Sequence, residues 1–192
     1  VVGRRTAARG FLTSPAYVGG ETVQETGGGV CQGSSTVYLA ALRSNLEIVE
    51  RYPHGYITRY VPDGMDATVY YGAKDFRFRN NTPFPIQVVG SVSGRSLTVS
   101  ILGTKSDNIT VEMTNQTVGT TGYKTVYKVD SSLPAGSTRV SVTPYAGYTV
   151  KVYRNLYENG KLKDTKLEST SVYRSRDKVV LVSPEDAAQY GL

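Results

Sequence analysis

The chain contains a single cysteine and a single histidine, Cys31 and His54, and these two side chains limit the chemistry that the sequence can support. A thiol beside an imidazole base is the minimum set for acyl transfer through a covalent intermediate. A zinc site made of His and Cys ligands needs more of these residues than the chain has. The sequence also carries no nucleotide-binding glycine motif and no Gly-x-Ser-x-Gly motif. We therefore expect no metal and no cofactor.

Cys31 follows three glycines and opens a segment that is expected to be helical. Backbone N–H groups at a helix N-terminus lower the pKa of a thiol and can also bind an oxyanion. Glycines let a substrate backbone approach closely, because they carry no Cβ. The alternative is a buried structural thiol, which is the usual role of an unpaired cysteine. The candidates for substrate binding or an oxyanion hole are Gly28, Gly29, Gln32, Arg5 and Arg59.

His54 lies in a turn-like segment, Arg51 to Tyr56, and is the only imidazole that can act as a base for Cys31. Asp66 stands where a turn leads into an apolar segment, and from there its carboxylate can orient the His54 ring in a Cys/His/Asp arrangement. Two alternatives stay open. His54 can be an ordinary surface residue, and Asp66 can cap its own turn.

One helix is predicted in the chain, at residues 31–44, with Asn45 as its C-terminal stop. Its packing face is predicted from small and apolar residues at helical spacing, namely Val37, Ala40, Ala41 and Ser44. The glycine-rich residues 1–30 before it are expected to be irregular. After it, alternating apolar residues predict strands at 46–50, 67–71, 76–79, 86–88 and 97–101. Residues 1–105 therefore read as an α+β domain, with one main helix packed on an antiparallel sheet.

A polar, turn-rich segment at residues 103–108 marks the expected boundary to a second domain, residues 106–192. No further helix is predicted there, so this part is expected to be a small all-β domain. The Asn159-Gly160 pair predicts a hairpin with a type I′ turn, which needs two positive φ angles. Further strands are expected at 109–113, 124–129, 138–142, 148–157, 167–173 and 178–182.

The composition of the 192 residues is that of a folded protein, with 39% hydrophobic and 20% charged residues. The net charge of +6 suits solubility or attraction to an anionic polymer. Nucleic acid is not expected as a partner, because no basic run exceeds two residues and no nucleic-acid-binding motif is present. The first residues lack the apolar stretch of a signal peptide. We therefore expect a fragment whose targeting and membrane-attachment segment lies upstream.

The run Gly27-Gly28-Gly29-Val30-Cys31-Gln32, the later Asp66-Ala67-Thr68-Val69 and the stretch Phe78-Arg79-Asn80-Asn81-Thr82 resemble the VanW family. The resemblance covers about residues 1–105, and the domain looks truncated at its N-terminal side. Gly33 departs from the family's usual valine, and Tyr52 stands where a second histidine is common. Residues 133–161 are similar to a G5-like β domain, with a looser match.

The resemblance to the VanW family implies an exported protein of the cell wall or of the outer membrane face in a Gram-positive bacterium. It also implies an L,D-transpeptidase that joins peptidoglycan stem peptides through two diaminopimelate residues. The family cysteine corresponds to Cys31 and the family histidine to His54. The expected partners are stem peptides, with membrane contact only through a segment outside this chain. Two alternatives are a wall cysteine peptidase and a non-catalytic wall-binding module.

Overall fold

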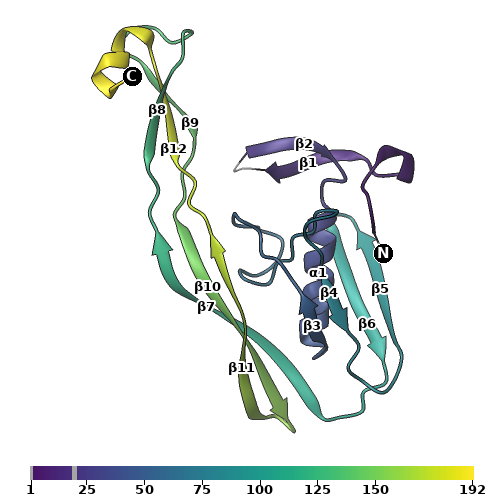
Figure 1. Ribbon diagram of the computed structural model, residues 1–192. Coiled ribbons are helices and arrows are strands. Elements are labelled where there is room, and N and C mark those ends of the chain that lie inside the picture. Colours follow the sequence, from purple (N-terminus) through teal and green to yellow (C-terminus); the bar gives the residue numbers. More distant parts are fainter. Residues whose placement is uncertain (1, 19–20) are drawn as a thin grey trace. The chain divides into compact units, whose positions relative to one another are not determined.

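The computed structural model describes residues 2–18 and 21–192, and the chain divides into two compact units (Figure 1). The first unit comprises Val1–Gln116 and Val150–Ser171, and the second comprises Thr117–Thr149 and Val172–Leu192. This division differs from a single cut near residue 105, because a segment late in the sequence belongs to the first unit. The domain boundary expected from the sequence therefore stays a prediction.

The first unit begins with a short 3-10 helix, η1 (Ala7–Arg9), and an antiparallel pair, β1 (Thr13–Val18) and β2 (Glu21–Thr26). The expectation that residues 1–30 are irregular was wrong. These strands are rich in Thr, Gln and Glu, and Pro15 interrupts the first, so they lack the apolar alternation by which a strand is predicted. The two strands pair with Thr13 opposite Thr26, and apolar alternation cannot predict such a pairing.

Helix α1 (Val30–Arg43) lies within one residue of the predicted helix. Its end at Ser44 and Asn45 is a Schellman motif, in which the N–H of Asn45 donates to Leu42 O and that of Leu46 donates to Ala41 O. Asn45 adopts the left-handed φ of 55° that this motif needs, and asparagine tolerates that conformation well. The prediction of Asn45 as the helix stop is confirmed.

The buried face of α1 differs from the predicted one. The fully buried residues are Ser35, Tyr38, Ala41 and Leu42, and only Ala41 belongs to the predicted set. Tyr38 and Leu42 supply far more apolar area than the small residues, so they turn inward and form a core cluster with Ala67. Ser35 is buried with them because its hydroxyl is fully hydrogen-bonded.

The rest of this part consists of antiparallel pairs, β3 (Glu47–Glu50) with β4 (Arg77–Arg79) and β5 (Ile86–Ser93) with β6 (Ser96–Gly103). Helix α1 contacts β3 and β6. An α+β arrangement is thus present, but the strands up to Gly103 form separate two-stranded sheets rather than one sheet under the helix.

The strand predicted at residues 67–71 is absent, and an isolated bridge between Tyr70 and Lys74 stands there instead. The backbone N–H groups that would pair with a neighbouring strand instead form hydrogen bonds with a side chain and with a loop carbonyl. The N–H of Ala67 donates to Ser35 Oγ, at 2.9 Å, and that of Thr68 donates to Tyr52 O, at 2.7 Å. Apolar alternation alone cannot distinguish these two ways of satisfying the backbone.

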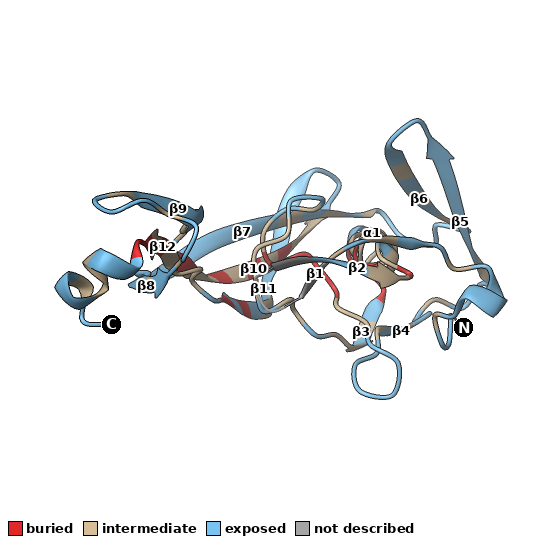
Figure 2. Ribbon diagram, turned by 90° about the horizontal axis from the view of Figure 1, so that it is seen from above, coloured by how far each residue is buried: buried red, intermediate tan, exposed pale blue. Residues whose placement is uncertain are grey.

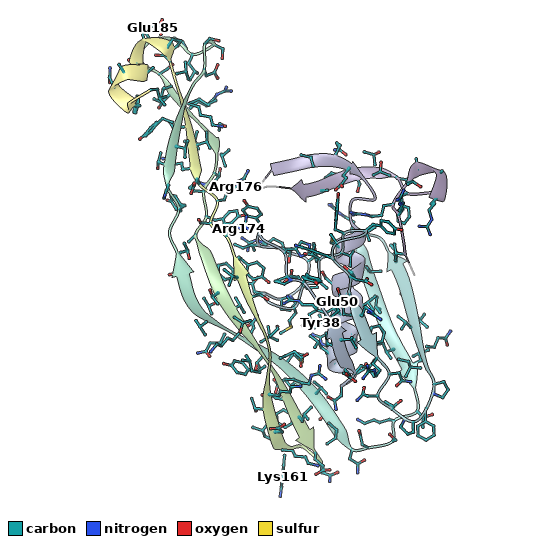
Figure 3. All side chains as sticks on the ribbon, in the orientation of Figure 1. Tyr38, Glu50, Lys161, Arg174, Arg176 and Glu185 are labelled. Carbon is teal, nitrogen blue, oxygen red and sulfur yellow. The ribbon has the colours of Figure 1, made fainter. Side chains whose placement is uncertain are left out.

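The hairpin of β10 (Gly147–Glu158) and β11 (Lys161–Tyr173) has its tip at the expected place, with φ of 51° at Asn159 and 78° at Gly160. Lys161 is labelled at this tip in Figure 3. The hairpin forms a three-stranded sheet with β7 (Ile109–Thr121), in the order β11-β10-β7. Figure 2 shows buried residues in red along β10, β11 and α1.

The part of this hairpin that belongs to the first unit packs closely against the segment around residue 64. Val150 and Val152 are buried, and a Cβ added to Gly64 would overlap the Val152 side chain. Gly64 also has a φ of 82°, in the left-handed region that favours glycine. The core of the first unit is therefore completed by residues 150–171, which come late in the sequence.

A buried ion pair also ties the hairpin to the end of α1, and its removal is expected to destabilise the first unit. Arg154 Nη1 donates to Leu46 O (3.0 Å) and Asn45 Oδ1 (3.1 Å). Its Nε lies 2.9 Å from Glu168 Oε2, an ionic contact without the direction of a good hydrogen bond. Arg154→Ala leaves Glu168 buried and unpaired, so we expect the free energy of unfolding to fall by about 3–5 kcal/mol in urea.

The exposed pair of Lys163 and Glu158 on the same hairpin is the matched control for that measurement. Lys163→Ala is expected to change the free energy of unfolding by less than about 1 kcal/mol, because water and salt screen an exposed pair. Equal effects of the two substitutions would contradict a structural role for Arg154.

The second unit contains a three-stranded sheet of β8 (Thr125–Val129), β9 (Thr138–Val142) and β12 (Lys178–Val182). The central β12 runs parallel to β8 and antiparallel to β9. The short helix η2 (Pro184–Tyr190) follows, although no helix was expected in this part. Ser183 caps it by accepting from Asp186 N, and a proline stands at its first position. Within residues 2–18 and 21–192, no helix is long and apolar enough to cross a membrane.

Candidate active site

The first turn of α1 leaves one backbone donor available beside the Cys31 side chain. Gly29 caps the helix with a φ of 89°, and Val30 N donates to Gly27 O while Gln32 N and Gly33 N donate to Gly29 O. For the Cys31 N–H, no hydrogen-bond acceptor is found among the described residues. This is the N–H that an oxyanion forming next to the sulfur would meet.

Two neighbouring serines of α1 fasten the segment 66–69 to this helix start. Ser34 Oγ donates to Ala67 O at 2.6 Å, and Ser35 Oγ accepts from Ala67 N at 2.9 Å while it donates to Cys31 O at 2.7 Å. The thiol of Cys31 in turn donates to Val69 O, with a sulfur–oxygen distance of 3.6 Å. The serines thus hold the segment that carries Asp66 beside the thiol.

The carboxylate of Asp66 orients His54 from two directions. Asp66 Oδ2 lies 2.6 Å from His54 Nδ1 and also accepts from the backbone N–H of His54 at 2.7 Å. The acid is completely buried, whereas the His54 side chain is 18% exposed. Because Nδ1 is occupied by the acid, Nε2 is the ring nitrogen that can exchange a proton with a neighbouring thiol.

Arg51 surrounds the same carboxylate from the opposite side. Its Nη2 lies 3.1 Å from Asp66 Oδ1, and the guanidinium also donates to Asp66 O (2.6 Å) and Gly64 O (2.9 Å). Its side chain is only 6% exposed, and its cationic carbon lies 5.3 Å from the centre of the Tyr38 ring. The buried positive charge and these hydrogen bonds favour the ionised form of Asp66.

Tyr60 stands at the solvent side of the imidazole. Its hydroxyl oxygen is 3.2 Å from His54 Nε2, and the two rings meet edge to face with their centres 6.2 Å apart. Partial burial raises the pKa of Tyr60, so the hydroxyl stays protonated near neutral pH and can donate a hydrogen bond.

The thiol and the imidazole influence each other's protonation. Burial by itself raises the pKa of Cys31, but a hydrogen bond with His54 and the charges of His54 and Arg5 outweigh it, so the pKa is lowered overall. Burial by itself lowers the pKa of His54, but its hydrogen bonds with Asp66 and Cys31 raise it to about 9. Both shifts favour a thiolate beside an imidazolium near neutral pH, which is the reactive form of a cysteine nucleophile.

The other residues expected at the site lie in different surroundings. Gly28 packs against β1, where an added Cβ would overlap Ser14, whereas Gly29 faces open space. Arg5 Nη1 donates weakly to Gly27 O, at 3.4 Å, and its charge reaches the thiol. Gln32 lines a groove next to the site, and Arg59 is exposed, with no ion pair or hydrogen bond found among the described residues.

Sequence reasoning missed Arg51, Tyr60 and the serine pair of α1. Arg51 is one of 22 Lys and Arg residues, and its one signal is that it lies in residues 47–54, which also resemble the VanW family. The stretch Tyr60-Val61-Pro62 also resembles the VanW family, and this resemblance was the one available signal for Tyr60. Within the described ranges, no group of three or more His, Cys, Asp or Glu side chains is placed to hold a metal ion.

These features define a protein with a thiol–imidazole–carboxylate constellation at a helix N-terminus, in an α+β unit that is followed by a β-rich region. Residues 1–102 match the family described as VanW like protein, and residues 108–184 match the G5 domain. The chain belongs to the VanW-like protein family, with a G5 domain after the VanW-like domain.

One relative from Bacillus subtilis matches about half of the chain. The protein YoaR of Bacillus subtilis (strain 168), described as uncharacterized, is 44% identical over 101 residues, which cover 53% of this chain and 33% of YoaR. The chain thus spans about a third of the length of that relative. VanW and G5 domains are typical of extracellular, cell-wall-associated proteins.

Two solved G5 structures show similarity to part of the chain. The structure of HP0197-G5 is 24% identical, covers 38% of this chain and 96% of its own, and has a TM-score of 0.22. The G5 domain of IgA1 protease is 16% identical, covers 41% of this chain and 94% of its own, and has a TM-score of 0.28.

Proposed function

We propose that the protein is a cysteine-dependent L,D-transpeptidase that crosslinks peptidoglycan stem peptides through a Cys31 thioester. The observation that supports this most strongly is the arrangement of His54 between a buried carboxylate and the only thiol of the chain. A structural cysteine has no need of an oriented imidazole with a raised pKa.

In the first half of the reaction, the Cys31 thiolate attacks the carbonyl carbon of the amide between diaminopimelate and the terminal D-alanine. A carbon–sulfur bond forms, and the oxyanion accepts a hydrogen bond from the Cys31 N–H. The carbon–nitrogen bond then breaks, and the imidazolium of His54 gives its proton to the leaving D-alanine amine. The products of this half are a thioester on Cys31 and free D-alanine.

In the second half, the side-chain amine of a second stem peptide attacks the thioester carbon. Neutral His54 takes the proton of that amine, the carbon–sulfur bond breaks, and the thiolate is restored. Asp66 keeps the Nδ1–H of His54 in place throughout, so that Nε2 handles the proton in both halves.

A groove next to the site suits a carboxylate-bearing peptide. It has a volume of about 560 Å³ and runs between α1 and β6, from Gln32 and Tyr60 beside the site. Two arginines, Arg43 and Arg95, line it, and none of its lining residues is Asp or Glu. Stem peptides carry free carboxylates, so positive charge without competing acids favours their binding.

Two other functions compete with this one. A wall cysteine peptidase uses the same thioester but lets water resolve it, and the exposed groove does not by itself keep water out. A non-catalytic wall-binding module needs no reactive thiol at all. The lowered pKa of Cys31 favours the two enzymes over the binding module.

Incubation with muropeptides that carry tetrapeptide stems is expected to release D-alanine and to yield dimers joined between two diaminopimelate residues. Mass spectrometry of the products checks this, and protein whose Cys31 has been alkylated with iodoacetamide is the control. Release of D-alanine with shortened monomers and no dimers would replace the transpeptidase with the peptidase. An absence of any product would overturn both enzymes.

A further inference from the structure

The segment that matches the G5 domain contributes a residue to the surroundings of the catalytic candidates. Ser171 lies in β11, within residues 108–184, and is completely buried. Its Oγ accepts from Arg51 Nη1 at 2.9 Å, although Arg51 lies 120 residues earlier, in the segment that matches the VanW-like family. Both residues belong to the first compact unit.

This contact fixes the part of the guanidinium that the local loop leaves unbound. Nε and Nη2 of Arg51 donate to acceptors on Gly64 and Asp66. Nη1 has its acceptor outside this loop, because it donates to Ser171 Oγ. A guanidinium on a buried side chain such as that of Arg51 is positioned well only when its planar N–H groups have acceptors. Ser171 supplies the acceptor that the loop does not provide.

The contacts form an uninterrupted series that ends at the base. Ser171 holds Arg51, Arg51 holds Asp66, and Asp66 Oδ2 lies 2.6 Å from His54 Nδ1. The strength of that last hydrogen bond is one reason why the pKa of His54 is raised.

We propose that Ser171 is a positioning residue for the Cys31–His54 pair, so that the G5-matching segment completes the site of the VanW-like segment. The inference deepens the proposed function and rests on His54 acting as the base. Ser171 touches neither thiol nor imidazole and acts through Arg51 and Asp66, as outer partners of a site commonly do. Loss of its hydroxyl lengthens the Asp66–His54 hydrogen bond without changing any charge.

The test uses the full chain and substrate-free readouts, because one histidine and one cysteine give unambiguous signals. Ser171→Ala is expected to lower the pKa of His54, and NMR titration of the His54 ring measures this change. It is also expected to slow alkylation of Cys31 by iodoacetamide at pH 7 by roughly threefold to tenfold, the equivalent of about half to one pKa unit. Thr170→Ala is the control, since Thr170 is exposed on the opposite face of β11 and should leave both readouts unchanged.

An unchanged His54 pKa and an unchanged alkylation rate in folded Ser171→Ala protein would overturn the inference and leave Ser171 as a packing residue. If that variant does not fold, Arg51→Lys carries the same test, because an ammonium keeps the charge beside Asp66 but cannot also bridge to Ser171. A lower pKa of His54 in Arg51→Lys then supports the inference, and an unchanged pKa overturns it. Failure of the wild-type protein to crosslink muropeptides refutes the transpeptidase instead, since neither readout here involves a substrate.

Discussion

Replacement of His54 by alanine is expected to slow crosslinking of muropeptides by roughly 100- to 10,000-fold, the usual contribution of a general acid–base group. The chain has no second imidazole that could replace it. The substitution also removes the hydrogen bond and charge that lower the pKa of Cys31, so the thiol pKa is expected to rise. Initial rates from pH 5 to 10 and the pH dependence of alkylation measure the two effects.

Gly55→Ala is the matched control for that experiment, because Gly55 is the next residue and a Cβ there meets open space. Its rate and pH profile are expected to resemble those of the wild-type protein. Near-native crosslinking by His54→Ala would refute the pair, and Cys31 would then depend on the helix N-terminus and Arg5 for its activation.

Asp66→Asn is expected to lower turnover less than His54→Ala, because the acid orients the ring and exchanges no proton with substrate. Asp66→Asn is also expected to lower stability, because Asp66 is completely buried against the Arg51 guanidinium. An amide leaves that charge unpaired, so the free energy of unfolding is expected to fall by about 3–5 kcal/mol. Urea unfolding measures this loss.

The pH dependence of stability gives Asp66→Asn a second readout. The pKa of His54 is about 9 in the folded protein, against an ordinary value of about 6.5 in an unfolded chain. Protonated His54 therefore contributes its full stabilisation below about pH 6.5, and that contribution is lost as the pH rises through about 9. In Asp66→Asn this decline should flatten, because the carboxylate that raises the pKa is gone. An equally steep decline in the variant would show that Asp66 does not control His54.

The local features of the site were open to prediction from the sequence. A helix after Gly27–Gly29 follows from the change of pattern at Cys31, and Asn45 marks its end by its tolerance of positive φ. The pairing of His54 with Asp66 could be suggested because Asp66 stands where a turn leads into an apolar segment, and the structure brings their side chains together.

The non-local features were not predictable, for physical reasons. Whether residues 67–71 pair in a sheet or bind Ser34 and Ser35 depends on tertiary contacts that apolar alternation does not report. The contact between Arg51 and Ser171 spans 120 residues, and serine and arginine at those positions look like any polar pair. Likewise, the buried face of α1 was set by Tyr38 and Leu42, whose partners lie outside the helix.

The seating of β10 and β11 in the first unit has a consequence for how such chains can be recombined. A gene fusion that joins residues 1–102 to an unrelated C-terminal module would carry every residue of the VanW-like match but would lack Val150, Val152, Arg154 and Ser171. Its exchanged module would have to bring an equivalent hairpin with it. Sequence borders that look like convenient crossover points are therefore poor ones in this architecture, and viable exchanges should retain the hairpin at residues 150–171.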